Sequence, residues 1–92
     1  MYVILPYTLN AAKRLKVIVL PSKRKNKKID VYDKHGNYIT SIGAKGAMDY
    51  PNYLKYFGKK YAEQRRRLYK LRHSKDRKIK GSAGYYADQL LW

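Results

Sequence analysis

The first apolar residues of the chain form a short run rather than a helical pattern. Residues 1–5 are apolar or aromatic, and Pro6 follows them. Such a run is typical of an edge strand or of an extended segment, because proline removes a backbone donor from the middle of a sheet. Residues 10–16 then carry a first basic cluster. We therefore expect residues 1–14 to form an extended N-terminal arm.

The pattern further along the chain predicts a small antiparallel sheet. Consecutive β-branched residues end at Pro21, which is typical of a buried strand. Two later β-prone runs flank a polar segment in which Gly36 and Asn37 both tolerate positive φ, and this predicts a β-hairpin. The predicted strands lie near residues 15–20, 29–33 and 38–42.

Spacings of three and four residues then predict two consecutive helices. Asp49 and Pro51 are typical of a helix start, because an acceptor side chain caps the first amides and proline fits the first turn. The helices are expected at about residues 51–57 and 59–73, with a break at Gly58. Their recurring apolar positions predict one core stripe. The stripe consists of Leu54, Phe57, Tyr61, Gln64, Leu68 and Leu71.

An apolar segment follows a charged linker at the end of the sequence. Ser82 can cap a short helix that runs toward Trp92. Trp92 would bury a large area if it docked, so we expect this clasp to pack on the domain or on a partner. With 92 residues the chain can form one small core. The predicted fold class is thus α+β, with a small antiparallel sheet, two helices and a C-terminal helical clasp in a single basic domain of residues 15–92.

The charge of the chain restricts its partners more than its fold. Twenty-two Lys and Arg stand against six acids, for a formal net charge of +16. Such an excess favours an anionic partner: nucleic acid, anionic lipid headgroups or the acidic face of another protein. The chain has no cysteine, which excludes disulfides and thiolate metal sites. No apolar run is long enough to span a bilayer.

The residue inventory argues against catalysis. The six acids are scattered, and no pair has a spacing that suggests a carboxylate dyad or a metal site. Two histidines without cysteine give no zinc signature, and no serine lies in a nucleophile elbow. We therefore expect no enzyme activity, no catalytic residue, no metal or cofactor, and no small-molecule substrate.

The densest basic patch lies in the second predicted helix, at residues 65–73. Guanidinium groups with interleaved aromatic rings suit the binding of phosphate or carboxylate groups. A loop rich in lysine precedes the hairpin and has the same character. The predicted anion-binding residues are Arg65, Arg66, Arg67, Tyr69, Lys70, Arg72 and His73 of the helix, with Lys23, Arg24, Lys25, Lys27 and Lys28 of the loop. The alternative is a solvated helix face and a mobile loop.

Apolar residues near both ends of the sequence form a second candidate surface. An exposed apolar run is expected to pack against something. The predicted docking residues are Val3, Ile4, Leu5, Tyr85, Tyr86, Leu90, Leu91 and Trp92.

Three pieces of the sequence resemble small basic proteins of unknown function that large nucleocytoplasmic DNA viruses encode, such as chlorella viruses and giant viruses. The pieces are Ile29–Asp33 with Gly36 and Ile42–Gly43; Asp49–Pro51 with Tyr53; and Arg66–Arg67, Tyr69, Arg72–His73, Gly81–Ser82, Tyr86 and Leu91–Trp92. The resemblance covers about residues 28–92, and residues 1–27 lie outside it. It implies a viral chain carried in the virion, without a catalytic site.

Two functions are compatible with these observations. The first is a minor capsid or cement protein that bridges acidic surfaces of capsid subunits or the inner membrane. The second is a sequence-nonspecific nucleic-acid-binding protein that neutralises and packages viral DNA through its phosphates. Either function would place the chain in the virion, in the inner capsid shell or the core, after synthesis in the infected host cell.

Overall fold

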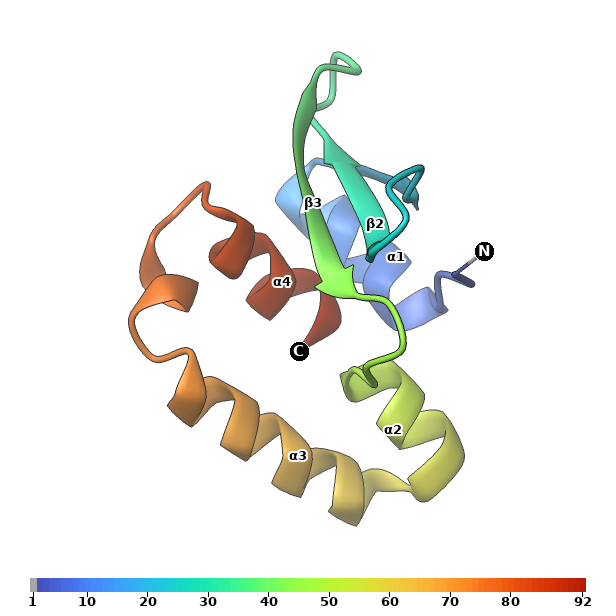
Figure 1. Ribbon diagram of the computed structural model, residues 1–92, viewed down its shortest axis with the longest axis vertical. Helices are drawn as coiled ribbons and strands as arrows, with labels where there is room; N and C mark the ends of the chain where they lie inside the picture. The colour runs from blue at the N-terminus through green and yellow to red at the C-terminus, as the bar shows by residue number, and fades with distance from the viewer. Residues whose placement is uncertain (1) are drawn as a thin grey trace.

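The computed structural model describes residues 2–92 and confirms the α+β class. The described part contains four α-helices, one short 3-10 helix and one three-stranded antiparallel sheet (Figure 1). In chain order the elements are α1 (Pro6–Leu15), β1 (Ile18–Pro21), β2 (Lys27–Tyr32), β3 (Tyr38–Ala44), α2 (Tyr50–Phe57), α3 (Lys59–Arg72), the 3-10 helix η1 (Asp76–Lys78) and α4 (Ala83–Leu91).

The sheet has the order β1-β2-β3, and neighbouring strands run antiparallel. The predicted hairpin between β2 and β3 is confirmed. Its turn is held by Asp33, whose Oδ1 accepts hydrogen bonds from the amides of His35 and Asn37 at 2.9 Å each. Gly36 adopts φ +87°, which a glycine reaches without steric cost.

The helix α1 corrects the predicted arm: residues 6–15 are helical, so an extended arm over residues 1–14 is wrong for them. Pro6 lies in the first turn, where its fixed φ suits a helix, and Lys16 ends the helix with φ +58°. Small side chains at Thr8, Ala11 and Ala12 form the buried face. This face has few large apolar residues, so the sequence pattern did not reveal it.

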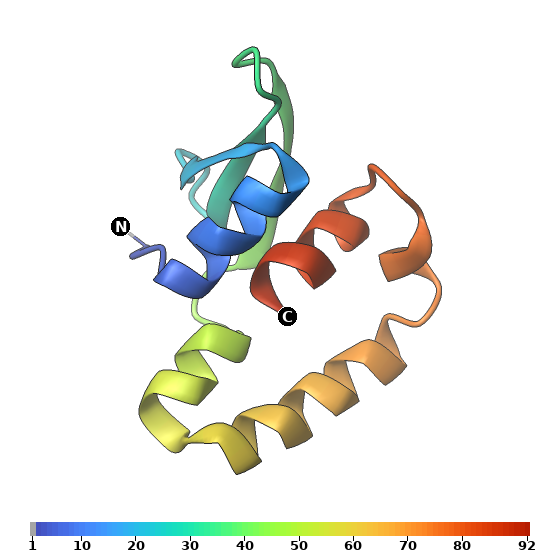
Figure 2. The same ribbon diagram turned by 180° about the vertical axis from the view of Figure 1, so that it is seen from behind.

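The core lies between the sheet and the two helices α1 and α4. Figure 2 shows both helices on one face of the sheet. The buried apolar residues of this cluster are Ala11, Ala12, Val19, Ile29, Val31, Ile42, Leu90 and Leu91. The Thr8 hydroxyl donates to the backbone carbonyl of Leu90 at 2.8 Å, which joins α1 to α4 inside the core. The C-terminal clasp therefore docks on the domain itself.

The helices α2 and α3 lie beyond the sheet and lead through η1 back to α4 (Figure 1). Their predicted boundaries are confirmed. The Asp49 carboxylate caps α2 by accepting a hydrogen bond from the Asn52 amide at 3.1 Å. Gly58, with φ +87°, separates α2 from α3. Ser82 caps α4 by accepting from the Tyr85 amide at 3.1 Å.

The predicted core stripe of α2 and α3 is wrong. Its members are exposed: Leu54 by 38%, Phe57 by 59%, Tyr61 by 42%, Leu68 by 44% and Leu71 by 68%, and Gln64 is exposed too. The buried positions of α3 are instead Ala62 and Tyr69. Long arginine side chains beside them can lay their methylene stems along the interior. The face of α3 that packs against the domain is therefore one with few leucines.

Candidate binding surface

The solvent face of α3 combines apolar and basic side chains in parallel rows. Tyr61, Leu68 and Leu71 recur at i, i+7 and i+10, so they share one side of the helix. We call these three residues the apolar stripe. At 100° per residue, Lys60 and Arg67 lie along one flank of the stripe, and Arg65 and Arg72 lie along the other.

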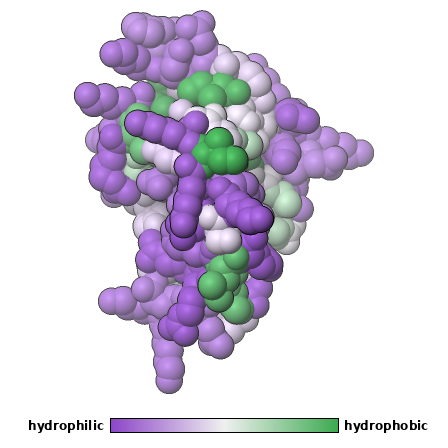
Figure 3. Space-filling model, turned by 90° about the vertical axis from the view of Figure 1, so that its left-hand side faces the viewer, coloured by the Kyte–Doolittle hydropathy of each residue, from purple (hydrophilic) through white to green (hydrophobic). Residues whose placement is uncertain are grey.

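Exposed hydrophobic area on the surface is broken up by charged side chains. Figure 3 shows one face of the molecule, on which small hydrophobic patches are separated by long hydrophilic side chains. Scattered apolar residues of this kind are normal, whereas contiguous ones mark interaction sites. On α3, Leu68 and Leu71 are one turn apart and adjacent, whereas the exposed Gln64 lies between Tyr61 and Leu68.

All six acids of the chain make contacts within the domain. Their partners are Ser22 and Ser41 for Asp30, turn amides for Asp33, Lys28 for Asp49, Arg66 for Glu63, His73 for Asp76 and Lys70 for Asp88. Among the 22 Lys and Arg, three form these ion pairs. The other Lys and Arg have no carboxylate partner within residues 2–92. The surface is therefore strongly positive, with few negative groups available to repel an anion.

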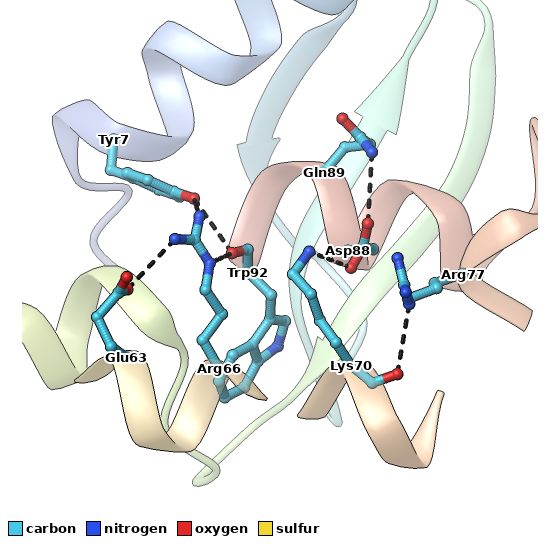
Figure 4. A network of polar contacts seen from close by, with 8 residues as sticks. All are labelled: Tyr7, Glu63, Arg66, Lys70, Arg77, Asp88, Gln89 and Trp92. Carbon is cyan, nitrogen blue, oxygen red and sulfur yellow. Dashed lines mark hydrogen bonds and ion pairs between the residues drawn. The ribbon is translucent and has the colours of Figure 1, made fainter. Parts of the chain in front are cut away.

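Arg66, at the centre of the predicted anion site, is half-buried and makes several contacts within the domain. Its Nε donates to the backbone carbonyl of Trp92 at 2.6 Å, and its Nη2 donates to the Tyr7 hydroxyl at 2.9 Å (Figure 4). Its Nη1 pairs with Glu63 at 3.3 Å, and the guanidinium lies 4.1 Å from the ring centroid of Tyr50. This one side chain connects α1, α2, α3 and α4.

Lys70 and Tyr69 also face inward. Lys70 Nζ pairs with the buried carboxylate of Asp88 at 2.8 Å (Figure 4). The Tyr69 ring lies parallel to the Trp92 ring, with centroids 4.3 Å and planes 6° apart. Burial, together with the nearby carboxylates of Asp88 and Asp76, raises the pKa of Tyr69 to about 12. Both residues therefore make contacts within the fold; Tyr69 is buried, whereas the Lys70 side chain is 33% exposed.

Lys28 is buried as well. Its Nζ lies 2.9 Å from Asp49 Oδ2, and both side chains are 5% exposed or less. The same carboxylate oxygen accepts from the Tyr2 hydroxyl at 2.6 Å. Burial and this carboxylate raise the pKa of the Tyr2 hydroxyl. Lys28 is thus neutralised inside the protein rather than offered to a partner.

The rest of the lysine loop is accessible. Lys23, Arg24 and Lys25 are exposed, and Lys27 is half-buried. Asp30 anchors the loop by accepting from the Ser22 hydroxyl at 2.5 Å and from the Lys23 amide at 3.2 Å. Figures 1 and 2 place this loop beside the sheet, away from α3. The structure therefore does not bring the two predicted basic clusters together.

Four predicted site residues remain on or near the outer surface of α3 and its end. Arg67 and Arg72 are exposed, and Arg65 and His73 are half-buried. His73 Nδ1 lies 3.0 Å from Asp76 Oδ2. Lys60, which the sequence did not single out, is exposed and extends the row that contains Arg67. Its place in the same row, seven residues before Arg67, was a signal available from sequence.

The predicted apolar docking residues mostly belong to the interior. Leu90 and Leu91 are core residues, and Ile4, Tyr86 and Trp92 pack against that core. Tyr85 and Leu5 are half-buried, whereas Val3 is 72% exposed. These residues therefore hold the domain together more than they offer a surface.

A cavity that the sequence did not predict lies at the C-terminal end of α3. Its volume is about 290 Å³, and its lining comes from Lys28 of β2, from the segment 43–49, from the end of α3 and from α4 with Trp92. Tyr69, Arg72, His73 and Trp92 are among the lining residues. The His73 ring stacks on the Tyr69 ring with centroids 4.3 Å apart. The rings of His73, Tyr69 and Trp92 therefore lie in a row along the wall of the cavity. The i, i+4 spacing of Tyr69 and His73 was the only sequence signal for this arrangement.

Residues 2–92 contain no group of three or more His, Asp or Glu placed to hold a metal ion. None of the helices described there combines the length and the apolar character that crossing a membrane requires. Comparison of the chain with protein-family models, with curated proteins and with solved structures gives no match.

Proposed function

We propose that the chain is a non-enzymatic structural protein that binds the acidic surface of another protein through the solvent face of α3. The observation that supports this proposal is the exposed apolar stripe between two rows of cations. The viral resemblance extends the proposal: the chain serves as a minor capsid or cement protein that bridges acidic surfaces of capsid subunits in the virion of a large DNA virus.

The arrangement suits a protein partner because protein interfaces combine an apolar centre with a polar rim. Tyr61, Leu68 and Leu71 would form the centre, and burying them removes apolar surface from water. Arg67 and Arg72 would form the rim, where arginine binds carboxylates through a planar fork. Complementary charge then selects an acidic partner and sets the orientation of binding.

Sequence-nonspecific nucleic-acid binding is the second candidate. The small number of carboxylates, six against 22 Lys and Arg, favours it, because phosphates would meet little repulsion on the surface. Phosphate contacts, however, give no role to exposed leucines. The two functions therefore predict different effects of replacing Leu68 and Leu71.

The test adds the purified chain back to salt-washed, DNA-free capsid shells of a virus that encodes it. We expect the wild-type chain to rebind, and Leu68→Ser/Leu71→Ser to rebind at least roughly tenfold more weakly, because the apolar centre is lost. Arg67→Gln/Arg72→Gln should also weaken rebinding. Lys25→Gln, on the loop beside the sheet, is the matched control and should behave as wild type.

A parallel titration uses a random-sequence DNA duplex. If the chain ignores the shells but binds this duplex with a steep loss of affinity on adding salt, and if the leucine variant binds it normally, the capsid proposal is wrong. Binding to vesicles of anionic lipid, with no binding to shells, would contradict it equally.

A further inference from the structure

We infer that the cavity at the C-terminal end of α3 is a pocket for one anchor of the acidic partner: an apolar side chain next to a carboxylate. This inference rests on the proposed function and names the kind of peptide that it would recognise. It adds a second contact site beside the apolar stripe.

The wall of the cavity suits an apolar side chain. Met48, Ala87, Leu91 and Trp92 line it together with the ring of Tyr69. Its volume of about 290 Å³ lies just below the range of about 300–1,000 Å³ that is typical of ligand pockets. The space therefore accommodates one side chain rather than a nucleotide. Buried aromatic walls of this kind are where anchor residues contribute most to affinity.

The charge of the lining selects a carboxylate. Lys28 and Asp49 both line the cavity, and their ion pair at 2.9 Å cancels their charges. His73 pairs with Asp76 at 3.0 Å. Arg72 also lines the cavity and is exposed, and its side chain makes no hydrogen bond or ion pair with residues 2–92. It is therefore the cation of the lining whose side chain has no partner, and its guanidinium can bind a carboxylate with two parallel hydrogen bonds.

Arg72 also connects the pocket to the proposed interface. It flanks the apolar stripe on the same helix that forms the wall of the cavity. A partner lying along the stripe would thus reach the pocket at the end of α3. Its acidic residue would meet Arg72 while the neighbouring apolar side chain enters the cavity.

The experiment uses three blocked dipeptides as probes: acetyl-Phe-Asp-amide, acetyl-Phe-Asn-amide and acetyl-Gly-Asp-amide. Each is titrated into the full chain, and the backbone amide shifts and the indole N–H of Trp92, the sole tryptophan, are followed by NMR. We expect acetyl-Phe-Asp-amide to shift residues 43–49 and Trp92 saturably. The other two probes should bind roughly tenfold more weakly or worse, since each lacks one of the two features.

Two variants and one control locate the contact. Arg72→Gln should remove the preference for the Asp probe over the Asn probe. Ala47→Leu should weaken the binding of acetyl-Phe-Asp-amide, because the larger side chain reduces the space in the cavity. Arg14→Gln, at an exposed arginine of α1 outside the stripe and the cavity, should bind like wild type. Amide spectra of the unliganded variants verify that each remains folded.

The pocket proposal would be overturned if the NMR shifts were confined to other exposed cations, or if the Asp and Asn probes bound equally well. If the shells rebind the chain but the dipeptides leave residues 43–49 unshifted, the pocket is wrong and the proposed function stands. If the dipeptides bind as expected but the shells do not rebind the chain, the proposed function fails and the pocket remains a peptide site.

Discussion

The guanidinium of Arg66 donates a hydrogen bond to the backbone carbonyl oxygen of Trp92 at 2.6 Å. This contact divides the run of three arginines into residues with different roles. Arg66 points into the domain, while its neighbour Arg67 is exposed to solvent. Consecutive residues of a helix differ by 100° in direction, so a basic run cannot present all its charges on one surface.

Arg66 should matter for stability, and Arg67 should not. Arg66→Ala removes charged hydrogen bonds to Trp92 and Tyr7, and we expect the free energy of unfolding to fall by about 2 kcal/mol. Arg67→Ala, as the matched exposed change, should stay within about 0.5 kcal/mol of wild type. Urea denaturation followed by circular dichroism measures both. Equal effects of the two substitutions would contradict the assigned roles.

Trp92 should contribute through its ring. It stacks on Tyr69 at 4.3 Å and lies 6.1 Å from the ring of Tyr53. Because Trp92 is half-buried, Trp92→Ala should cost about 2–3 kcal/mol, below the cost of removing a fully buried aromatic. Thermal unfolding should show a lower midpoint. Tyr56→Ala, at a tyrosine that is 65% exposed, is the control and should leave the midpoint nearly unchanged.

The buried pair of Lys28 and Asp49 should behave as a unit. Lys28→Met leaves the Asp49 carboxylate without its cation, and we expect a loss of about 3–5 kcal/mol in the free energy of unfolding. The double variant Lys28→Met/Asp49→Asn should lose less than the sum of the two single variants, because no unpaired charge remains. A double-mutant cycle in guanidinium chloride measures this coupling, and additive effects would show that the pair is not coupled.

Substitution of Gly43 should destabilise the domain more than substitution of Gly36. Its φ is +79°, and an added Cβ would lie 2.9 Å from Lys28 Cδ and 3.0 Å from Leu91 Cδ1. Gly36 has a similar φ of +87°, but an added Cβ there meets no atom within 4 Å. Gly36→Ala should therefore report backbone strain alone, roughly 1 kcal/mol. Gly43→Ala should destabilise the domain further in the same denaturation assay, and equal losses would contradict a steric contact.

Asp30 should make the domain sensitive to acid. Burial by itself would raise the pKa of the Asp30 carboxyl, but hydrogen bonds from Ser22 and Ser41 and from the Lys23 amide outweigh it and lower the pKa. A lowered pKa in the folded state means that stability is present above about pH 4 and is lost as the pH falls through the folded pKa.

The free energy of unfolding, measured by urea denaturation from about pH 6 down to about pH 2, checks this expectation. Asp30→Asn should be less stable than wild type near neutral pH, and its stability should depend less on pH in the acid range. An unchanged pH profile would show that Asp30 does not carry the acid response.

Local sequence signals were sufficient for much of the fold. The hairpin followed from Gly36 and Asn37 between β-prone runs, and the turn forms as predicted. Asp49 and Ser82 cap helices where their types and positions indicated. These features depend on residues close together in sequence, so their physics is readable without the tertiary structure.

The helix α1 and the buried face of α3 were not predicted, for a common reason. Both faces contain small buried residues, such as Ala11 and Ala62. On α3 the larger apolar residues, such as Leu71, lie on the opposite side. Hydrophobic periodicity identifies which residues share a side of a helix, but it does not tell which side meets the core.

The sequence by itself determined the α+β class, the hairpin, the helix boundaries from residue 50 onward and the large positive charge. The tertiary structure decided which cations are used internally and which remain free. Arg66, Lys70 and Lys28 form ion pairs with Glu63, Asp88 and Asp49, respectively. These acids lie between 3 and 21 residues away in the chain. Only folding brings most of these groups together, so a charge count alone could not separate the structural cations from those exposed beside Leu68 and Leu71.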